Sequence, residues 1–283
     1  MPLRPDLRSD ARVKRLMTNM TISIKPLTPA IGSTIRCVDL SKLDDDTFAE
    51  IQATLFERCM LVIPDQQDDD ATLLSFAERR GDIMFTPMLT SLNGYPGILQ
   101  VRNRGKSGTP TEYWHSDSPY LKHPPAISIL AARELPASGG DTMWCNQYLA
   151  YEALSDGMKA LLEGRRVKYS GAKMAKRTGH EGDIPFTLHP AVRTHPETGR
   201  KALFIGNAEL TPCFEDMTEE ESRPLLDYLY RQSPNPDRTY RHSWKPGDLV
   251  LWDNRCAMHY AVHDYGEAAR FMHRITIAGE RPY

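Results

Sequence analysis

Residues 247–277 read GDLVLWDNRCAMHYAVHDYGEAARFMHRITI, and the predicted fold rests on the strands in this stretch. Residues 271–277 are rich in β-branched and apolar side chains, which is typical of a strand. Residues 247–253 form another short β-rich segment, and Asp253-Asn254 after it predicts a turn that aims the chain carrying His259. If Arg270 begins the last strand, the two-residue period places four side chains on one face: Arg270, Met272, Arg274 and Thr276.

Two arginines on one face of an otherwise apolar strand are costly to bury unless anions meet them. A guanidinium binds a carboxylate through two parallel hydrogen bonds, so a carboxylate ligand is a natural partner. The alternative for both Arg270 and Arg274 is a structural salt bridge with an aspartate or glutamate. The spacing of Arg270, eleven residues after His259, favours the ligand interpretation for Arg270.

Residues 111–120, TEYWHSDSPY, contain the tripeptide His115-Ser116-Asp117. In an extended segment residues i and i+2 point to the same side, so His115 and Asp117 can both reach one metal ion. Together with His259 they form the 2-His-1-carboxylate set of a mononuclear non-haem Fe(II) site. The alternative is a loop histidine beside a surface aspartate. Four other histidines are rival third ligands: His263, His242, His123 and His273.

The remaining chain alternates short β-rich segments with a few helices, which predicts a mainly β protein with flanking helices, built as a sandwich or barrel. Gly and Pro turns separate the strands. Four helices are expected: one in which Phe48, Ile51 and Leu55 follow an acidic start, and others over residues 71–81, 151–164 and 218–232. Thr218 and Glu221 predict a capping box for the last of these.

Four blocks carry a resemblance to a known family: WHSDSPY, PPAISILAARELPASGGDTMW, GDLVLWDNRCAMHYAVHDY and ARFMHRITIAGERP. In order and spacing they resemble the TauD/TfdA family of Fe(II)- and 2-oxoglutarate-dependent dioxygenases, and the similarity runs from about Ile22 to the C-terminus. The resemblance implies a double-stranded β-helix, which is a cupin-like jelly roll with helices packed outside. It also implies that the iron sits in the mouth of the roll.

The same resemblance implies the roles of individual residues. His115, Asp117 and His259 would be the iron ligands, while Thr142 and Arg270 would hold the distal carboxylate of 2-oxoglutarate. Fe(II), 2-oxoglutarate and O2 would then be required, and succinate and CO2 would be released as one substrate C–H bond is hydroxylated. No catalytic residue beyond the metal centre is expected.

Substrate preference is expected to depend on three further residues. Arg274 matches the arginine that holds the sulfonate in the taurine enzymes, whereas Thr86 stands where those enzymes have a histidine. Thr111 stands where the family has an asparagine near the substrate. These two replacements argue against taurine itself, whereas Arg274 favours a small organic anion, such as a sulfonate, sulfate ester or aryloxy carboxylate. Hydroxylation beside the heteroatom would then break a C–S or C–O bond.

Composition limits the partners of this 283-residue chain. A net charge of −2 without a dense basic patch argues against nucleic acid, and no apolar run approaches the ~18 residues of a membrane span. Five scattered cysteines without a CxxC pair are typical of free thiols in a reducing cytoplasm, where we expect this protein. Dimers or tetramers are common among the enzymes that the chain resembles, so a homo-oligomer is expected.

Residues 1–20 lack the apolar core of a secretory signal and are interpreted as a flexible tail before a single catalytic domain over residues 21–283. Two alternative functions stay open. A zinc hydrolase can use the same three ligands with a water, but it would not need Thr142 and Arg270 as a dicarboxylate anchor. A non-catalytic jelly-roll binding or sensor protein would not need an intact ligand set.

Overall fold

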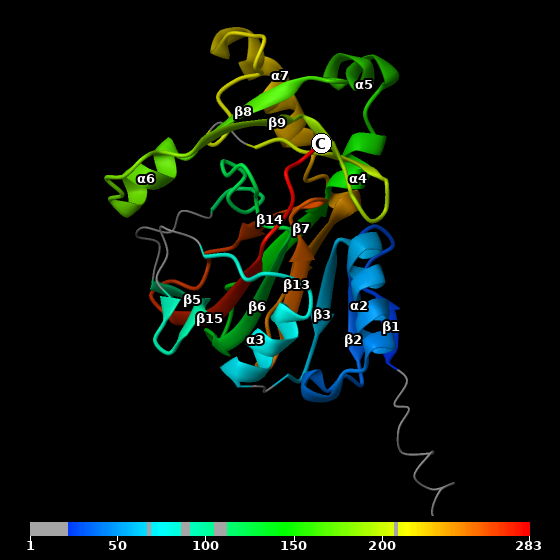
Figure 1. The fold of residues 1–283 in the computed structure, drawn as a ribbon, viewed down its shortest axis with the longest axis vertical. Coiled ribbons are helices and arrows are strands. Elements are labelled where there is room, and N and C mark those ends of the chain that lie inside the picture. The colour runs from blue at the N-terminus through cyan, green and yellow to red at the C-terminus, as the bar shows by residue number, and fades with distance from the viewer. Residues whose placement is uncertain (1–21, 67–68, 86–90, 105–111, 207–208) are drawn as a thin grey trace, which may run out of the picture.

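The protein is described by a computed structural model that covers residues 22–66, 69–85, 91–104, 112–206 and 209–283. Its largest sheet has eight strands in the order β1-β2-β3-β13-β6-β15-β5-β4 (Figure 1). Neighbouring strands are antiparallel except β2 and β3, which are parallel. The strand bounds are β1 Ser23–Pro26, β2 Ser33–Arg36, β3 Met60–Ile63, β4 Ser91–Leu92, β5 Tyr95–Arg104, β6 Ile127–Glu134, β13 Leu249–Asp253 and β15 Ala269–Ile277.

Both faces of the middle of this sheet are buried, which explains the unbroken apolar run in β13. Leu249 and Leu251 pack in one core cluster with side chains of helices α2 (Asp45–Arg58) and α3 (Asp70–Glu78). Val250 and Trp252 point the other way and join a second cluster. Figure 1 shows α2 and α3 on the same side of the sheet.

A smaller sheet covers the second face and completes the roll. It has three strands in the order β12-β7-β14, with bounds Thr239–His242, Thr142–Asn146 and Ala257–Ala261. Trp144 of β7 is fully buried between the two sheets, and its ring centroid lies 5.8 Å from that of Trp252. The prediction of a mainly β protein with a jelly-roll core is confirmed.

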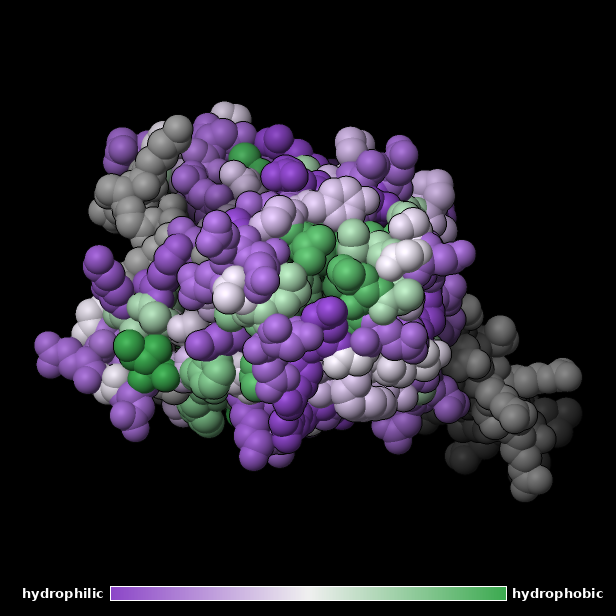
Figure 2. Space-filling view, turned by 90° about the horizontal axis from the view of Figure 1, so that it is seen from above, coloured by the Kyte–Doolittle hydropathy of each residue, from purple (hydrophilic) through white to green (hydrophobic). Residues whose placement is uncertain are grey.

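The other elements gather beyond one end of the roll around a third apolar cluster, at the top of Figure 1. They comprise β8 Arg166–Ser170, β9 Phe186–Pro190, β10 Val192–Thr194, β11 Lys201–Leu203, α4 Gln147–Glu152, α5 Asp156–Leu162, α6 Ala172–Thr178 and α7 Glu219–Gln232. Short 3-10 helices occupy Leu40–Lys42 and Pro236–Arg238. From above, this end is mostly hydrophilic with an apolar area near its centre (Figure 2).

Two of the predicted helices begin where their capping signals indicate. The side chain of Asp44 accepts the Thr47 N–H at the start of α2, and Phe48 on the inner side of this helix is buried. Thr218 and Glu221 form the predicted capping box of α7. The apolar spacing and the capping residues thus agree, and both predictions are confirmed.

The prediction of one helix over residues 151–164 is wrong, because the chain forms α4 and α5 with a break between them. Ser155 has an extended backbone and accepts the Met158 N–H, so its side chain starts a new helix. The helix over residues 71–81 also ends earlier than expected. α3 stops at Glu78, because Arg80 N–H donates to Ala77 O at 3.0 Å in a tighter closing turn.

The prediction of a flexible tail concerns residues 1–20, which lie outside the described residues. A single catalytic domain over residues 21–283 stays a prediction. Within the described ranges, no helix is both long enough and apolar enough to cross a bilayer.

Candidate metal centre

His115 and His259 are brought side by side by an isolated antiparallel bridge, in which His259 belongs to β14. His115 N–H donates to His259 O at 3.0 Å, and His259 N–H donates to His115 O at 2.8 Å. Residues that exchange both backbone hydrogen bonds lie directly opposite each other, with their side chains on one side. The two imidazole centroids are accordingly 4.1 Å apart.

Asp117 completes the group. Its Oδ1 lies 4.0 Å from His115 Nε2 and 3.6 Å from His259 Nε2. All three side chains are buried, and their ligand atoms lie within 4.8 Å of one another. Ser116 points elsewhere and donates its hydroxyl to Ala257 O at 3.1 Å. The prediction that His115 and Asp117 point to the same side is therefore confirmed.

The imidazole of His115 is in the tautomer that binds a metal through Nε2. His115 Nδ1 lies 2.8 Å from the carbonyl oxygen of Tyr113, which can only accept, so Nδ1 carries the proton and Nε2 keeps its lone pair. Burial lowers the pKa of His115. Burial and the neighbouring His115 lower the pKa of His259 well below its usual value. Both rings are therefore neutral at pH 7.

Asp117 supplies the negative charge. Burial alone would raise the pKa of its carboxyl, but the Arg274 guanidinium and the hydrogen bond from Ser128 oppose burial, and the pKa lies far below its usual range. A buried carboxylate and two neutral imidazoles that converge in this way fit a divalent cation of the Fe(II) type.

Arg270, on β15, is a buried cation without an acidic partner among the described residues. Its residue is only 4% exposed, and no described carboxylate forms an ion pair with it. Burial lowers the pKa of its guanidinium, but an arginine side chain keeps its charge in proteins. An uncompensated buried charge is costly, so this cation favours an anionic ligand.

Neutral groups hold the Arg270 guanidinium in place. Nε donates to Gly140 O at 3.0 Å and Nη2 donates to Thr142 Oγ1 at 3.3 Å. Thr142 Oγ1 also accepts the indole N–H of Trp244 at 3.0 Å, and the guanidinium carbon lies 5.7 Å from the Trp244 ring centroid. Gly140 has a φ of +73°, and a Cβ there would lie 3.2 Å from Arg270 Cδ, so the loop before β7 needs glycine.

Arg274 lies on the same face of β15 but in a different setting. Its Nη2 is 2.6 Å from Asp117 Oδ2, and its side chain is 16% exposed. The structure thus places Arg274 at the metal centre. There it forms a salt bridge with an aspartate, which the sequence analysis gave as the alternative to binding an anionic ligand. Thr86 and Thr111, the other expected substrate residues, lie outside the described residues.

None of the four rival histidines joins the group formed by His115, Asp117 and His259. His242 lies 2.9 Å from Asp248, His273 lies 2.6 Å from Asp70, His263 lies 3.5 Å from Glu112, and His123 is exposed.

A second buried group, formed by His195, Asp253 and Cys256, has the spacing of metal ligands but not their electrostatics. Arg255 donates to Oδ1 of Asp253 at 2.9 Å and to Oδ2 at 2.6 Å, while His195 Nε2 lies 3.1 Å from Oδ2. Both carboxylate oxygens are engaged, and a guanidinium already supplies the positive charge. This group is a structural ion-pair network.

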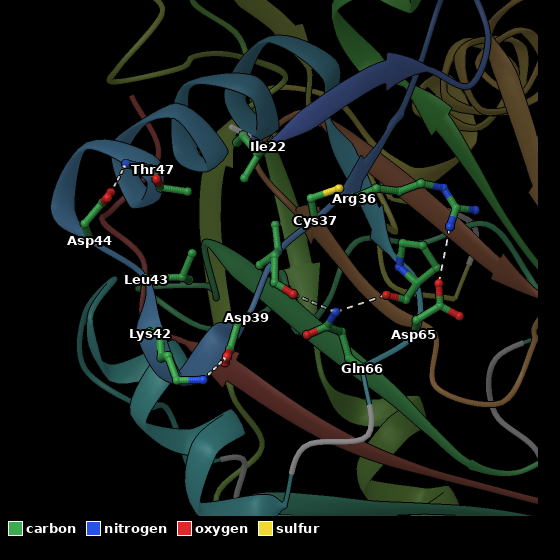
Figure 3. A pocket seen from close by; sticks show the side chains of 12 residues that line it. Ile22, Arg36, Cys37, Asp39, Lys42, Leu43, Asp44, Thr47, Asp65 and Gln66 are labelled. Carbon is green, nitrogen blue, oxygen red and sulfur yellow. Dashed lines mark hydrogen bonds and ion pairs between the residues drawn. The ribbon is translucent and has the colours of Figure 1, made fainter. Parts of the chain in front are cut away.

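A surface groove of about 740 Å³ lies beside β2 and the start of α2 (Figure 3). Its charged groups pair with one another, Arg36 with Asp65 at 3.2 Å and Lys42 with Asp39 at 2.6 Å. The Gln66 amide donates to backbone carbonyls. No residue of the metal-binding group lines this groove, so it is not the candidate site.

The sequence model of the taurine catabolism dioxygenase TauD, TfdA family matches residues 23–276. The chain belongs to the TauD/TfdA family. It is therefore a 2-oxoglutarate-dependent dioxygenase, an oxidoreductase that uses Fe(II), 2-oxoglutarate and O2. The resemblance inferred from the four sequence blocks is confirmed.

Individual TauD/TfdA relatives differ in the substrates for which they are named. An (S)-phenoxypropionate/alpha-ketoglutarate-dioxygenase of Sphingobium herbicidovorans is 34% identical, over 91% of this chain and 95% of its own. An alpha-ketoglutarate-dependent sulfate ester dioxygenase of Pseudomonas putida is 32% identical, over 93% and 91%. The crystal structure of a taurine dioxygenase from Burkholderia xenovorans has a TM-score of 0.81 at 31% identity, covering 92% of each chain.

Three residues beside the TauD/TfdA site were not predicted to matter for it. Ser128 donates to Asp117 Oδ2 at 2.6 Å, Asn254 accepts the Asp117 N–H at 3.1 Å, and Trp244 holds Thr142. Of the three, only Asn254 belongs to a sequence pattern that was interpreted, and that pattern predicted a turn. The sequence offered no signal for Ser128, which is an ordinary position in an apolar strand.

Proposed function

We propose that this enzyme hydroxylates a C–H bond of a small organic anion, with His115, Asp117 and His259 as the iron ligands. The observation that carries the assignment is the convergence of His115 Nε2, His259 Nε2 and Asp117 Oδ1. Three protein ligands on one side of the ion leave the opposite positions open. When bound there, Fe(II) and 2-oxoglutarate supply the oxidising chemistry, in which O2 is consumed and succinate and CO2 are released.

Arg270 and Thr142 would bind the distal carboxylate of 2-oxoglutarate. The Arg270 guanidinium neutralises that carboxylate and orients the cosubstrate by its planar fork. Thr142 already accepts hydrogen bonds from Arg270 and Trp244, so its own O–H is directed away from both and is available to the carboxylate. No side chain is needed as a general base, and the protein contributes placement and exclusion of water.

Arg274 would bind the anionic group of the substrate. Its guanidinium reaches the metal centre and is partly exposed, so a substrate anion there would place a neighbouring C–H bond beside the iron. The named relatives act on a phenoxypropionate, a sulfate ester and taurine, which are all small molecules with an anionic group. Where hydroxylation falls beside sulfur or oxygen, the product would fragment at the C–S or C–O bond.

The dioxygenase fits the site better than the two alternatives. A zinc hydrolase does not require a buried cation at the position of Arg270, because it binds no dicarboxylate cosubstrate. A non-catalytic jelly-roll protein does not require three converging metal-ligand atoms. Anaerobic addition of Fe(II) and then 2-oxoglutarate to the full chain is expected to produce a visible charge-transfer band. If the band is absent and the protein instead catalyses a zinc-dependent hydrolysis, the proposal is overturned.

The substrate is to be found by a screen that measures succinate release from sulfonates, sulfate esters, aryloxy acids and amino-acid derivatives. We expect at least one anionic class to stimulate succinate release above the uncoupled background. A homo-oligomer, either a dimer or a tetramer, stays a prediction that light scattering tests.

Arg274→Ala is expected to lower kcat/KM for the best anionic substrate by roughly 10- to 100-fold, since a hydrogen bond to a charged group contributes about 1.5–3 kcal/mol. A neutral analogue of the same shape, such as the sulfonamide of a sulfonate substrate, should lose much less. Both rates are measured by succinate release at saturating Fe(II) and 2-oxoglutarate. An equal loss for both substrates would contradict this role for Arg274.

A further inference from the structure

We propose that Ser128 and Asn254 are positioning residues that hold Asp117 with a single oxygen toward the metal, and so raise the affinity of the site for Fe(II). This inference rests on the proposed function, because it concerns the same three ligands. It assigns a role to side chains that touch neither the metal position nor the substrate.

A continuous chain of buried hydrogen bonds leads from β13 to the Asp117 carboxylate. The indole N–H of Trp252 donates to Asn254 Oδ1 at 3.0 Å, and Asn254 Nδ2 donates to Ser128 Oγ at 3.0 Å. Ser128 Oγ then donates to Asp117 Oδ2 at 2.6 Å. Ser128 is 0% exposed, and Trp252 and Asn254 are each 2% exposed, so water does not compete.

The direction of this chain is fixed by the groups that can only donate. An indole N–H has no acceptor function, so Asn254 must present its oxygen to Trp252. The same oxygen accepts the backbone N–H of Asp117 at 3.1 Å, which secures the amide orientation. Asn254 Nδ2 therefore faces Ser128 as a donor, and the single hydroxyl proton of Ser128 is left for Asp117 Oδ2.

The consequence is an asymmetric carboxylate. Oδ2 accepts from Ser128 and pairs with Arg274 at 2.6 Å, whereas Oδ1 faces the two imidazoles. An Asp117 that turned both oxygens to the metal would occupy a position that the three-ligand face leaves open for the cosubstrate. The hydrogen bond from Ser128 opposes that rotation.

Ser128 and Arg274 share Oδ2 but differ in their surroundings. Arg274 is partly exposed and is the proposed contact of the substrate anion, while Ser128 on β6 and Asn254 in the β13–β14 turn are both buried. Trp252 and Ser128 are also direct partners across β13 and β6. Ser128 therefore keeps Asp117 in place when Arg274 turns to a substrate.

Ser128→Ala tests the role with the smallest change in volume, and Ser116→Ala is its matched control. Ser116 is also buried beside the ligands, but its hydroxyl donates to Ala257 O and not to the carboxylate. Groups that only orient metal ligands contribute roughly 10- to 100-fold to metal affinity. We expect Ser128→Ala to weaken Co(II) binding by about 10-fold or more, and Ser116→Ala to leave it within about twofold.

Anaerobic titration with Co(II), whose d–d bands report coordination, gives the affinity without turnover, and the Fe(II)–2-oxoglutarate band gives a second readout. If Ser128→Ala does not fold, Ser128→Cys keeps a side chain of the same shape with a larger atom and a weaker donor, and it should also weaken Co(II) binding. Equal Co(II) affinity and unchanged spectra in the Ser128 variant and the control would overturn the positioning role. If the wild-type protein neither binds the metal nor shows the Fe(II)–2-oxoglutarate band, the proposed function itself is contradicted.

Discussion

His259→Ala is expected to reduce O2-dependent succinate release by more than about a hundredfold, since loss of partners that only orient metal ligands already costs roughly 10- to 100-fold. His259 supplies one of three ligand atoms, and its ring packs between His115 and Trp252 with centroids 4.1 and 4.8 Å away. His115→Ala and Asp117→Ala should have comparable effects. Succinate is measured at saturating 2-oxoglutarate, and bound iron is measured under anaerobic conditions.

His273→Gln is the matched control for these ligand variants. His273 is a buried histidine that the sequence offered as a rival ligand, yet it lies on the opposite face of β15, 2.6 Å from Asp70. Its replacement should cost stability but leave iron binding and the charge-transfer band intact. Succinate release that persists in His259→Ala at the wild-type rate would remove the assignment of the metal ligands.

The parts of the site that the sequence predicted are those that depend on short-range geometry. His115 and Asp117 point to one side because an extended segment allows nothing else. Arg270 and Arg274 share the inner face of β15 through the two-residue period, even though β15 shifts register against β6 between Phe271 and Met272. The direction of these side chains depends only on the local backbone conformation, which the pattern of apolar and polar residues in a short segment predicts well.

The relations that the sequence did not predict are contacts between distant segments. Thr142 meets Trp244, and Asn254 meets Asp117, across more than a hundred residues of chain. The sequence also could not distinguish the settings of the two arginines on β15. Arg274 forms an ion pair with Asp117, whereas Arg270 forms none with a described carboxylate and is held by Gly140 and Thr142. Local patterns carry no information on such pairings.

Arg270→Ala is expected to raise the KM for 2-oxoglutarate by roughly 30-fold to several thousandfold, because truncating one partner of a buried charge pair costs about 2–5 kcal/mol. The substrate KM, measured at saturating 2-oxoglutarate, should change far less. Arg270→Lys keeps the charge but loses the planar fork, so its cosubstrate KM should lie between those of the wild type and the alanine variant.

A stability measurement separates this role of Arg270 from a structural one. In the protein without cosubstrate the guanidinium is buried and forms no ion pair with a described carboxylate. Replacing it by alanine therefore removes a desolvation penalty as well as packing contacts, and the two effects on stability partly cancel. We therefore expect Arg270→Ala to melt near the wild-type Tm without 2-oxoglutarate. Wild type loaded with Mn(II) should gain Tm when 2-oxoglutarate is added, and the variant should not, because only ligands that bind the native state shift its unfolding. An unchanged cosubstrate KM with an equal gain in Tm would show that the anion is held elsewhere.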